Sequence, residues 1–377
     1  MHILITGGAG FIGSHTADRL LSLGHRIRIL DNLQPAVHPL GKPDYLDDRI
    51  DFLQGDVRNR DILLHALKDI DVVYHFAAYQ DYLPDFSTFF SVNTVSTALI
   101  YELIVEWRLP IRKIIVAASQ AVMGEGRYHC PQCAPSADRF IYPSIRLEAQ
   151  LSQGKWDHEC PVCNCPLQWL PSDETVIHPC NPYAISKHAE EAIAVHLGSR
   201  YGIPSVVMRY SIVQGPRQSI FNAYSGAMRI FALSLYNRRP PCIFEDGQQI
   251  RDFVNIEDVV DANVLVLEKD EADGKVFNVG GNVPWTINAF YQTMQSITGI
   301  DIEPVRDGHY RYGDTRHIVS DTTRLQSLGW FPRRTVAYSI ERYWEELLRK
   351  EGHREILESA ENNMKRLNVI RKVRGFP

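Results

Sequence analysis

The stretch Ile3-Leu4-Ile5-Thr6-Gly7-Gly8-Ala9-Gly10-Phe11-Ile12-Gly13 lies at the start of the chain and decides its fold. Its apolar beginning, within His2–Thr6, predicts a buried β-strand. The glycines that follow permit a tight turn and a close approach of the backbone to a ligand. A segment of helix length then continues over Ser14–Leu23. The stretch therefore predicts a strand, a glycine turn and a helix in succession.

The same alternation of short apolar runs and helix-length segments continues through the first half of the chain. Further strands are predicted at Arg26–Leu30, Asp51–Gln54, Val72–Phe76, Lys113–Ala118 and Ser205–Tyr210, and further helices at Arg60–Leu67, Thr94–Trp107 and Pro182–Tyr201. This pattern is typical of an α/β fold, in which a doubly wound parallel sheet carries helices on both faces.

The pattern changes near Pro216, where elements become shorter and Pro, Gly and aromatic residues more frequent. We therefore expect residues 1–215 to form the first domain and residues 216–377 to form a smaller C-terminal lobe. The polar, partly basic tail after Leu348 is expected to be a solvated helix, with a partner-binding tail as the alternative.

The bulk composition narrows the class of protein. The chain has 377 residues, of which 45% are hydrophobic and 23% are charged, as in soluble globular proteins. A net charge of -5 argues against a nucleic-acid partner, which would require a basic face. We recognise neither an apolar run of membrane-spanning length nor a signal peptide. A cytoplasmic protein without a membrane partner is therefore expected.

The glycine turn has the features of a dinucleotide site. Gly7, Gly10 and Gly13 would place the N-terminus of the following helix against a pyrophosphate, where its partial positive charge is stabilising. Asp31 ends the next predicted strand and can accept hydrogen bonds from both ribose hydroxyls, whereas it would repel a 2′-phosphate. The sequence therefore favours NAD over NADP; a glycine turn followed by a chance Asp is the alternative.

Five of the seven cysteines lie within residues 130–165. Cys130 and Cys133 form one Cys-Pro-x-Cys pair, and Cys160 and Cys163 form another. In a reducing compartment such clustering favours a metal over disulfides, so we expect a structural zinc held by these four thiolates. Reduced thiols in a segment held by packing alone are the alternative. The substitute ligands are Cys165, His129, His158 and His178, and Cys180 and Cys242 are expected to be small buried residues.

Tyr183 and Lys187 lie in a segment predicted to be helical, with Asn181 as its N-cap and Pro182 in its first turn. They would therefore share one face of the helix. The ordinary pKa of a tyrosine, about 10, is too high for a general base, and a neighbouring lysine and a cationic nicotinamide ring would favour the phenolate. Ser119, at the end of a predicted strand, would hydrogen-bond the same substrate oxygen. An exposed Tyr and Lys on a surface helix are the alternative.

Over almost its whole length the chain resembles the extended short-chain dehydrogenase/reductase family of nucleotide-sugar enzymes. The motifs that carry the resemblance are Thr6–Gly13, Asp31–Leu33, Gly55–Arg58, His75–Ala78, Asn93-Thr94, Ala118–Gly124, Asn181–Lys187, Arg209–Gln218, Gly247–Val254 and Arg311–His317. Within the family the chain is most similar to the dTDP-L-rhamnose 4-epimerase branch, whose members carry a Cys-rich insertion after the catalytic Ser. The resemblance implies a Rossmann-like fold, an insertion at about residues 125–180, and a homodimer.

The resemblance also implies the site residues. Ser119, Tyr183 and Lys187 would be catalytic. The residues expected to bind NAD are Gly7, Gly10, Phe11, Ile12, Gly13, Asp31, Asn32, Asp56, Val57, Ala77, Ala78, Asn93, Tyr183, Lys187 and Tyr210. The residues expected to bind the substrate are Ser119, Asn222, Arg251, Arg311 and Asp314. The two arginines would grip a diphosphate and Asp314 would accept from the nucleotide ribose, with surface charges or structural ion pairs as the alternative.

The expected reaction follows from two missing acids. Dehydratases of this family place an Asp-Glu pair just after the catalytic Ser or Thr, whereas this chain has Gln120 and Ala121, neither of which exchanges a proton. The resemblance therefore implies a 4-epimerase of a dTDP- or UDP-linked hexose that passes through a 4-keto sugar. A 4-ketoreductase or dehydrogenase that exchanges NAD(H), and a non-catalytic NAD-binding scaffold, are the alternatives. Departures from the family pattern at Ile212, Met123 and Gln80 leave the sugar unidentified.

Overall fold

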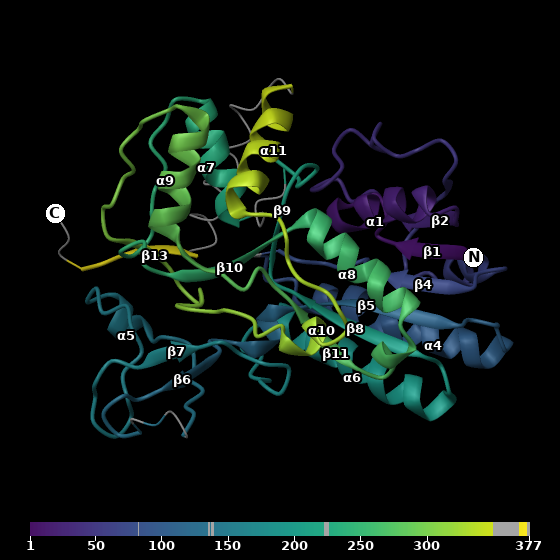
Figure 1. The fold of residues 1–377 in the computed structure, drawn as a ribbon, viewed down its shortest axis with the longest axis horizontal. Coiled ribbons are helices and arrows are strands. Elements are labelled where there is room, and N and C mark those ends of the chain that lie inside the picture. Colours follow the sequence, from purple (N-terminus) through teal and green to yellow (C-terminus); the bar gives the residue numbers. More distant parts are fainter. Residues whose placement is uncertain (82, 135, 137–138, 222–225, 350–368, 375–377) are drawn as a thin grey trace.

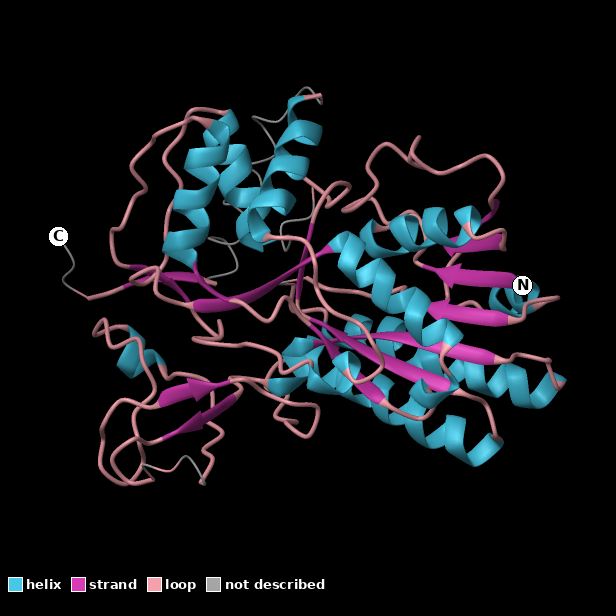
Figure 2. Cartoon of the chain, viewed as in Figure 1, coloured by secondary structure: helices cyan, strands magenta, loops and turns pink. Residues whose placement is uncertain are grey.

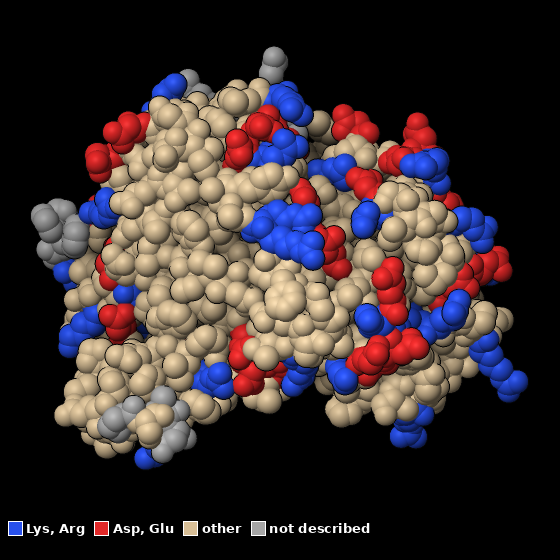
Figure 3. Space-filling view, in the orientation of Figure 1, with Lys and Arg blue, Asp and Glu red and all other residues tan. Residues whose placement is uncertain are grey.

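The computed structural model describes residues 1–377 except for 82, 135, 137–138, 222–225, 350–368 and 375–377. It has a large α/β lobe, a smaller C-terminal lobe and a small inserted unit (Figures 1 and 2). On the face drawn in Figure 3, acidic and basic side chains are mixed on the right-hand part and along the rim, and a broad area on the left carries few charges. Most of the predicted solvated tail, residues 350–368, lies outside the described residues.

The large lobe is built on a seven-stranded parallel sheet in the order β11-β8-β5-β4-β1-β2-β3. Its strands are β1 (His2–Thr6), β2 (Arg26–Asp31), β3 (Asp51–Gln54), β4 (Val72–His75), β5 (Lys113–Ser119), β8 (Ser205–Tyr210) and β11 (Val276–Val279). The six strands predicted from the sequence are confirmed, with ends that differ by at most a residue. The strand order reverses between β1 and β4, and ligands of such sheets bind at the carboxyl ends of strands beside this point.

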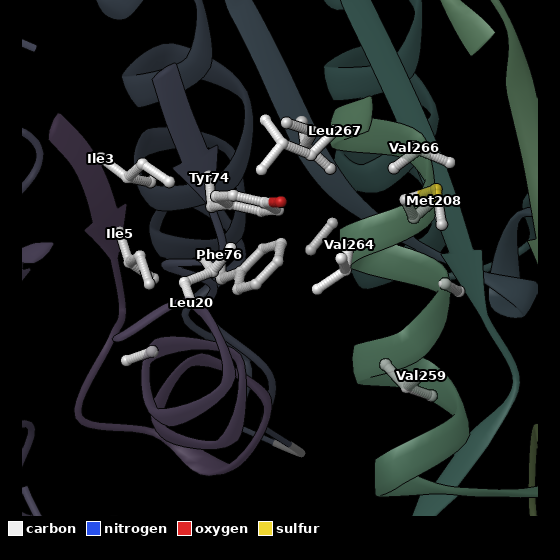
Figure 4. Close-up of a cluster of buried hydrophobic side chains, with 14 of the residues drawn as sticks. Ile3, Ile5, Leu20, Tyr74, Phe76, Met208, Val259, Val264, Val266 and Leu267 are labelled. Carbon is white, nitrogen blue, oxygen red and sulfur yellow. The ribbon is translucent and has the colours of Figure 1, made fainter. Parts of the chain in front are cut away.

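Helices cover both faces of the large sheet. Helices α1 (Phe11–Ser22) and α8 (Ile256–Glu268) pack together on one face, and α2 (Arg60–Leu67), α4 (Ser96–Trp107) and α6 (Pro182–Tyr201) lie on the other. Figure 4 shows Tyr74 and Phe76 of the sheet region directed toward Val264 and Leu267 of α8. Burying each such side chain contributes about 1.5–3 kcal/mol before the cost of ordering it.

The C-terminal lobe has a core of its own. It contains β9 (Ile212–Gln214), β10 (Ile250–Asn255), β12 (Pro284–Thr286), α7 (Gly226–Tyr236), α9 (Ile287–Thr298) and α11 (Val336–Leu348), with a three-stranded sheet in the order β12-β10-β9. Its smaller elements are β13 (His309–Arg311) and β14 (Ile370–Lys372), whereas α10 (Thr323–Gln326) packs against β11 of the large lobe. The chain returns to the large lobe through α8, η3 (Asp270–Ala272) and β11, which lie beyond the boundary expected at residue 216.

The inserted unit lies between β5 and α6. A short turn of helix, η2 (Gln120–Met123), leads from β5 into β6 (Arg127–His129), α5 (Glu148–Leu151) and β7 (Gln168–Leu170), and β6 pairs with β7 in antiparallel fashion. In Figure 1 this unit lies apart from the large sheet and below the C-terminal lobe. We refer to residues 125–180 as the Cys-rich insertion.

One helical run corrects an expectation from the sequence. Helix α3 (Phe86–Phe89), η1 (Phe90–Val95) and α4 are continuous. The run Phe86–Trp107 is long and apolar enough to cross a membrane by length and composition alone, although no such run was recognised in the sequence. In the structure α4 packs against α2 and α6, and η1 packs against α6. These contacts within the large lobe bury part of the run, whereas Phe86, Val95, Val105 and Trp107 are exposed.

Candidate active site

The glycine turn joins β1 to α1 at the carboxyl edge of the large sheet. Gly7 has φ +66°, and a Cβ there would lie 2.7 Å from the backbone of Ala77. A Cβ on Gly13 would lie 2.5 Å from the carbonyl oxygen of Gly7, so only glycine allows α1 to approach the turn so closely. Gly10 is the N-cap of α1 and lines the main cleft. The helix N-terminus therefore lies in the cleft wall, as a pyrophosphate site requires.

Asp31 ends β2 beside this turn and is buried. Its carboxylate accepts hydrogen bonds from the backbone N–H groups of Ala9, at 3.0 Å, and Leu33, at 2.9 Å. Each carboxylate oxygen has two lone pairs, so both keep the capacity to accept from a ribose hydroxyl. Asp31 therefore also fixes the turn to β2, a role that the sequence did not predict.

The other residues predicted to bind NAD fall into two groups. Those that line the cleft are Gly7, Gly10, Phe11, Ile12, Gly13, Ala78, Tyr183, Lys187 and Tyr210. The second group, Asn32, Asp56, Val57 and Ala77, is not among the residues that line the cleft. The Asn32 side chain donates to Asp56 at 3.3 Å, and the hydrogen bonds of Asp56 with Arg58 lower the pKa of its carboxyl to about 2. This carboxylate is therefore charged at neutral pH.

Asn93 is fully buried, and its amide is engaged within the protein. Its Oδ1 accepts from the backbone N–H of Tyr79 at 2.7 Å, while its Nδ2 donates to the Tyr79 carbonyl and to Ser186 Oγ. Asn93 thus braces the segment after β4 against α6. Ala78 and Gln80, which flank the braced residue, line the cleft.

Ser119 and Tyr183 meet at the floor of the cleft, although the Cys-rich insertion separates them in the sequence. Ser119 ends β5, and its hydroxyl is hydrogen-bonded to Tyr183. Helix α6 begins at Pro182 because Asn181 caps it: Asn181 Oδ1 accepts from the backbone N–H of Ala184 at 2.8 Å. The arrangement predicted for Ser119, Tyr183 and Lys187 is therefore present, with all three lining the cleft.

Glu190 is a buried partner of Lys187 that the sequence analysis missed. Lys187 Nζ donates to Glu190 Oε2 at 2.7 Å and to the Ala117 carbonyl at 2.6 Å, and the two side chains are 2% and 0% exposed. An ammonium has three donors, so one remains for a ligand. The i,i+3 spacing on a predicted helix was the signal that could have revealed this pair.

The pKa of Tyr183 is set by opposing effects. Burial raises it, while the charge of Lys187 and the hydrogen bond with Ser119 lower it without cancelling the effect of burial. Glu190 adds a smaller upward contribution. A second positive charge beside the phenol is therefore needed to make it a strong base at neutral pH, and a nicotinamide ring carries one.

Glu190 leads to a prediction about stability. Burial raises the pKa of its carboxyl to about 7, although Lys187 opposes this. Since the folded protein holds this proton more tightly than the unfolded chain, the contribution of Glu190 favours folding below an ordinary Glu pKa of about 4.3 and is lost as the pH rises through 7. Glu190→Gln should therefore lose less unfolding free energy than the wild type between about pH 5 and about pH 8. Urea denaturation at the two pH values measures this, and equal losses would contradict the expected effect.

The cleft runs between the lobes and has a volume of about 1400 Å³. Arg251, Arg311 and Asp314, the predicted substrate residues of the C-terminal lobe, line it together. Arg251 Nη2 donates to Asp314 Oδ2 at 3.1 Å, and Arg311 lies over the ring of Phe244 at 5.1 Å. Burial would raise the pKa of Asp314, but the nearby arginines lower it overall. Asn222 lies outside the described residues.

The three departures from the family pattern differ in position. Gln80 and Ile212 line the cleft. Met123 does not line it and is fully buried against Val176 and Ile318. Its apolar side chain therefore serves the base of the insertion, which the motif alone did not reveal.

The four cysteines of the two Cys-Pro-x-Cys pairs converge at one end of the insertion. Their sulfur atoms all lie within 4.8 Å of one another, with Cys130 and Cys163 at 3.5 Å and Cys133 and Cys160 at 3.9 Å. Four thiolates around a tetrahedral zinc at about 2.3 Å would have sulfur–sulfur distances of about 3.8 Å. The geometry of these side chains therefore fits a four-coordinate metal ion.

The other cysteines and histidines have different surroundings. Cys165 donates to Gln132, His129 pairs with Gln168, and His158 lies 3.1 Å from Glu125. His178 stacks on Tyr142. Two expectations were wrong: Cys180 is exposed, and Cys242 is only partly buried, lines the cleft and approaches Asp307. Each directly follows a proline, Pro179 or Pro241.

A tyrosine on a helix that meets a serine at a strand end, across a dinucleotide cleft, defines an oxidoreductive enzyme of the short-chain dehydrogenase/reductase type. Comparison with known families agrees: residues 3–144 and 166–280 match the NAD dependent epimerase/dehydratase family, and the chain belongs to it. The interval between the two matched parts, residues 145–165, lies in the Cys-rich insertion and contains Cys160 and Cys163.

Two named relatives are similar to this chain over most of their length. The dTDP-L-rhamnose 4-epimerase of Burkholderia thailandensis is 31% identical over 350 residues, covering 90% of this chain and 92% of that protein. The putative UDP-glucose 4-epimerase of Methanocaldococcus jannaschii is 30% identical over 349 residues, covering 90% and 96%.

Solved structures of 4-epimerases are also similar to this chain. The UDP-glucose 4-epimerase of Thermotoga maritima, solved with UDP-glucose, has a TM-score of 0.74 at 28% identity and covers 93% of this chain and 99% of its own. The UDP-glucose 4-epimerase of Thermus thermophilus, solved with NAD, has a TM-score of 0.72 at 25% identity and covers 92% and 99%.

Proposed function

We propose that this protein is an NAD-dependent 4-epimerase of a nucleotide-linked hexose. The observation that carries the proposal is the contact of Tyr183 with Ser119 in a cleft that has Gln120 and Ala121 where a dehydratase needs its acids. An intact hydroxyl-oxidising pair without a dehydrating pair suits a reaction that begins and ends at the oxidation level of an alcohol. The similarity to named 4-epimerases supports the same conclusion.

In this reaction the protein moves one proton. NAD, when bound, supplies the acceptor and then the donor of the C4 hydride. Tyr183 takes the proton of the sugar 4-hydroxyl as the hydride leaves, and it returns that proton to the ketone oxygen once the sugar has presented its other face. Ser119 holds the same oxygen, and the charge of Lys187 lowers the pKa of the phenol against the larger effect of burial. Sugar, proton and hydride are all conserved over the cycle.

Retention of the cofactor distinguishes an epimerase from a ketoreductase, and the segment between β2 and β3 favours retention. Residues 37–45 of this segment line the cleft. Tyr45 donates to the Ala9 carbonyl of the glycine turn at 2.7 Å, and Arg217 lies over its ring at 4.6 Å. Ser219 Oγ approaches the Val37 carbonyl from the C-terminal side of the chain. The segment is therefore fastened at both ends over the site expected for NAD.

The substrate end of the cleft suits a nucleoside diphosphate. Arg251 and Arg311 provide guanidinium groups, which match phosphate oxygens in geometry and charge. The named relatives act on dTDP- and UDP-linked sugars, so we expect one of these two nucleotides.

The function is tested by incubating the purified protein with dTDP- and UDP-linked hexoses and following the C4 configuration by NMR. We expect isomerisation without added NAD and without net change in NADH absorbance. Stoichiometric NADH formation or consumption would instead identify a dehydrogenase or ketoreductase, and binding without turnover of any sugar would favour the scaffold.

We also propose that Cys130, Cys133, Cys160 and Cys163 hold a structural zinc. All four positions of a tetrahedral ion would be filled by thiolates, so the ion would stabilise the fold of the insertion and take no part in catalysis. Support comes from the convergence of the four sulfur atoms. The cytoplasmic location and the homodimer expected from the sequence remain predictions.

Elemental analysis tests the metal. We expect about one zinc per chain and its loss, with a lower melting temperature, in Cys160→Ser, because a structural zinc contributes directly to folding. Cys165→Ser is the matched control and should keep the ion. Wild-type protein without stoichiometric metal after purification under reducing conditions would refute the zinc site.

A further inference from the structure

A buried ion pair joins the Cys-rich insertion to the C-terminal lobe. Arg146 lies in the insertion between β6 and α5, and Glu245 lies in the segment before β10. Arg146 Nη1 donates to Glu245 Oε2 at 2.8 Å, and Nη2 donates to Oε1 at 2.8 Å. Both side chains are 1% exposed. Two parallel charge-assisted bonds without solvent competition fix distance and angle together.

The backbone at Glu245 is unusual for a residue of this type. Its φ of +56° lies in the left-handed region, which glycine adopts freely and other residues rarely adopt. The chain keeps an acidic side chain there, and that side chain binds both Arg146 and Arg316, the latter at 3.1 Å. A residue that keeps an unfavourable backbone conformation and has buried charged partners indicates a position where the side chain has a specific role.

Arg146 also contacts the segment that carries the substrate residues. Its Nη2 donates to the backbone carbonyl of Asp314 at 2.7 Å. The Asp314 side chain in turn accepts from Arg251 at 3.1 Å, and both residues line the cleft. Arg146 of the insertion therefore contacts the backbone of Asp314, which with Arg251 is expected to bind the nucleotide.

Further contacts hold the same segment from the insertion side. The backbone N–H of Arg316 donates to Glu125, and Arg316 Nε donates to Asp157 at 2.8 Å. Arg316 also forms two bonds with Asp246 of the C-terminal lobe. The segment that contains Asp314 and Arg316 is thus held by charged side chains of both the insertion and the C-terminal lobe.

We propose that Arg146 is a positioning residue for substrate binding: through Glu245 and the Asp314 carbonyl it sets the place of Arg251 and Asp314 in the cleft. The proposal rests on the proposed function for the identity of the ligand. In this proposal the Cys-rich insertion supports the part of the cleft that binds the nucleotide. It takes no part in the proton transfer by Tyr183. The insertion then acts on affinity and leaves cofactor binding alone.

The test compares Arg146→Met and Arg146→Lys with the wild type. Direct titration with UDP and with dTDP measures nucleotide affinity, and NAD content and melting temperature are recorded on the same preparations. Arg146→Met should weaken binding of the preferred nucleotide by roughly three- to thirtyfold, the range of networked substitutions, with NAD content retained. KM should rise by a similar factor and kcat should change little. Arg146→Lys keeps the charge and should recover part of the affinity.

Arg127→Met is the matched control, because Arg127 also belongs to the insertion but pairs with Asp173 and the Pro171 carbonyl. It should leave nucleotide affinity unchanged. Wild-type affinity in a folded Arg146→Met protein would overturn the proposal, as would an equal loss in the Arg127→Met control. Should Arg146→Met fail to fold, Glu245→Gln, which keeps one acceptor for Arg146, provides the same comparison. Because binding is read without turnover, absence of epimerase activity in the wild type would count against the proposed function alone.

Discussion

Tyr183→Phe is expected to lower kcat by roughly 10²- to 10⁴-fold, the range typical of a lost general acid–base group. The substitution removes one oxygen atom and leaves the ring that lines the cleft. The substitution removes the group proposed to take the proton of the 4-hydroxyl as the hydride departs. Because Lys187 keeps its bonds to Glu190 and the Ala117 carbonyl, α6 should retain its place and NAD should remain bound. Rapid-quench measurement of epimer formation gives kcat, and extraction of the protein gives NAD content.

A matched variant sharpens this test. Tyr101 of α4 is buried and does not line the cleft, and its hydroxyl is hydrogen-bonded to Ser205 Oγ at 2.7 Å. Tyr101→Phe should therefore keep kcat within about threefold, because it removes no group from the reacting atoms. Equal activity in the Tyr183→Phe protein and the wild type would show that the phenol does no chemistry, and the catalytic assignment would have to be abandoned.

Gly13→Ala is expected to abolish NAD retention and to lower activity by at least roughly 10²-fold, since misplacement of a ligand by about 1 Å has effects of that size. The new Cβ would lie 2.5 Å from the Gly7 carbonyl and 2.7 Å from Gly8 Cα. Both neighbours are backbone atoms, so neither can rotate away. The turn or α1 must shift, and the helix N-terminus then no longer meets the pyrophosphate in the same place. The absorbance ratio and mass of the released cofactor measure occupancy.

Gly24→Ala provides the control for a general effect of adding a methyl group to this region. Gly24 follows α1, and a Cβ there would meet open space, although its φ of +84° carries some backbone strain. This variant should keep its cofactor. Full NAD occupancy in Gly13→Ala would mean that the pyrophosphate does not approach the glycine turn.

Local sequence patterns were sufficient to predict six of the seven strands of the large sheet. Buried parallel strands tend to be apolar runs, and β1, β4, β5 and β8 each contain such a run. Tyr183 and Lys187 could be placed on one helix face because their spacing, the Asn181 cap and Pro182 are all local features. The glycine turn could also be predicted, because its backbone conformation depends on residues adjacent in the sequence.

Contacts between segments distant in the sequence could not be predicted from local patterns. Arg146 lies in a segment with no motif, and its partners Glu245 and Asp314 are far away in the sequence, so no local spacing connects them. Asn93 and Asp31 matched motifs, yet their bonds to Tyr79 and Ala9 depend on how loops pack in three dimensions. The boundary near residue 216 missed β11 because β11 follows elements of the C-terminal lobe in the sequence and joins the large sheet only through its pairing with β8.

The central claim, that one hydride leaves C4 and returns to the opposite face within a single active site, is tested most directly with a substrate deuterated at C4. Turnover in ordinary water with purified enzyme and no added cofactor should yield the epimer with deuterium still at C4, as NMR or mass spectrometry of the product would show. Loss of the label to water, or its transfer to NAD that is free in solution, would contradict the proposed mechanism.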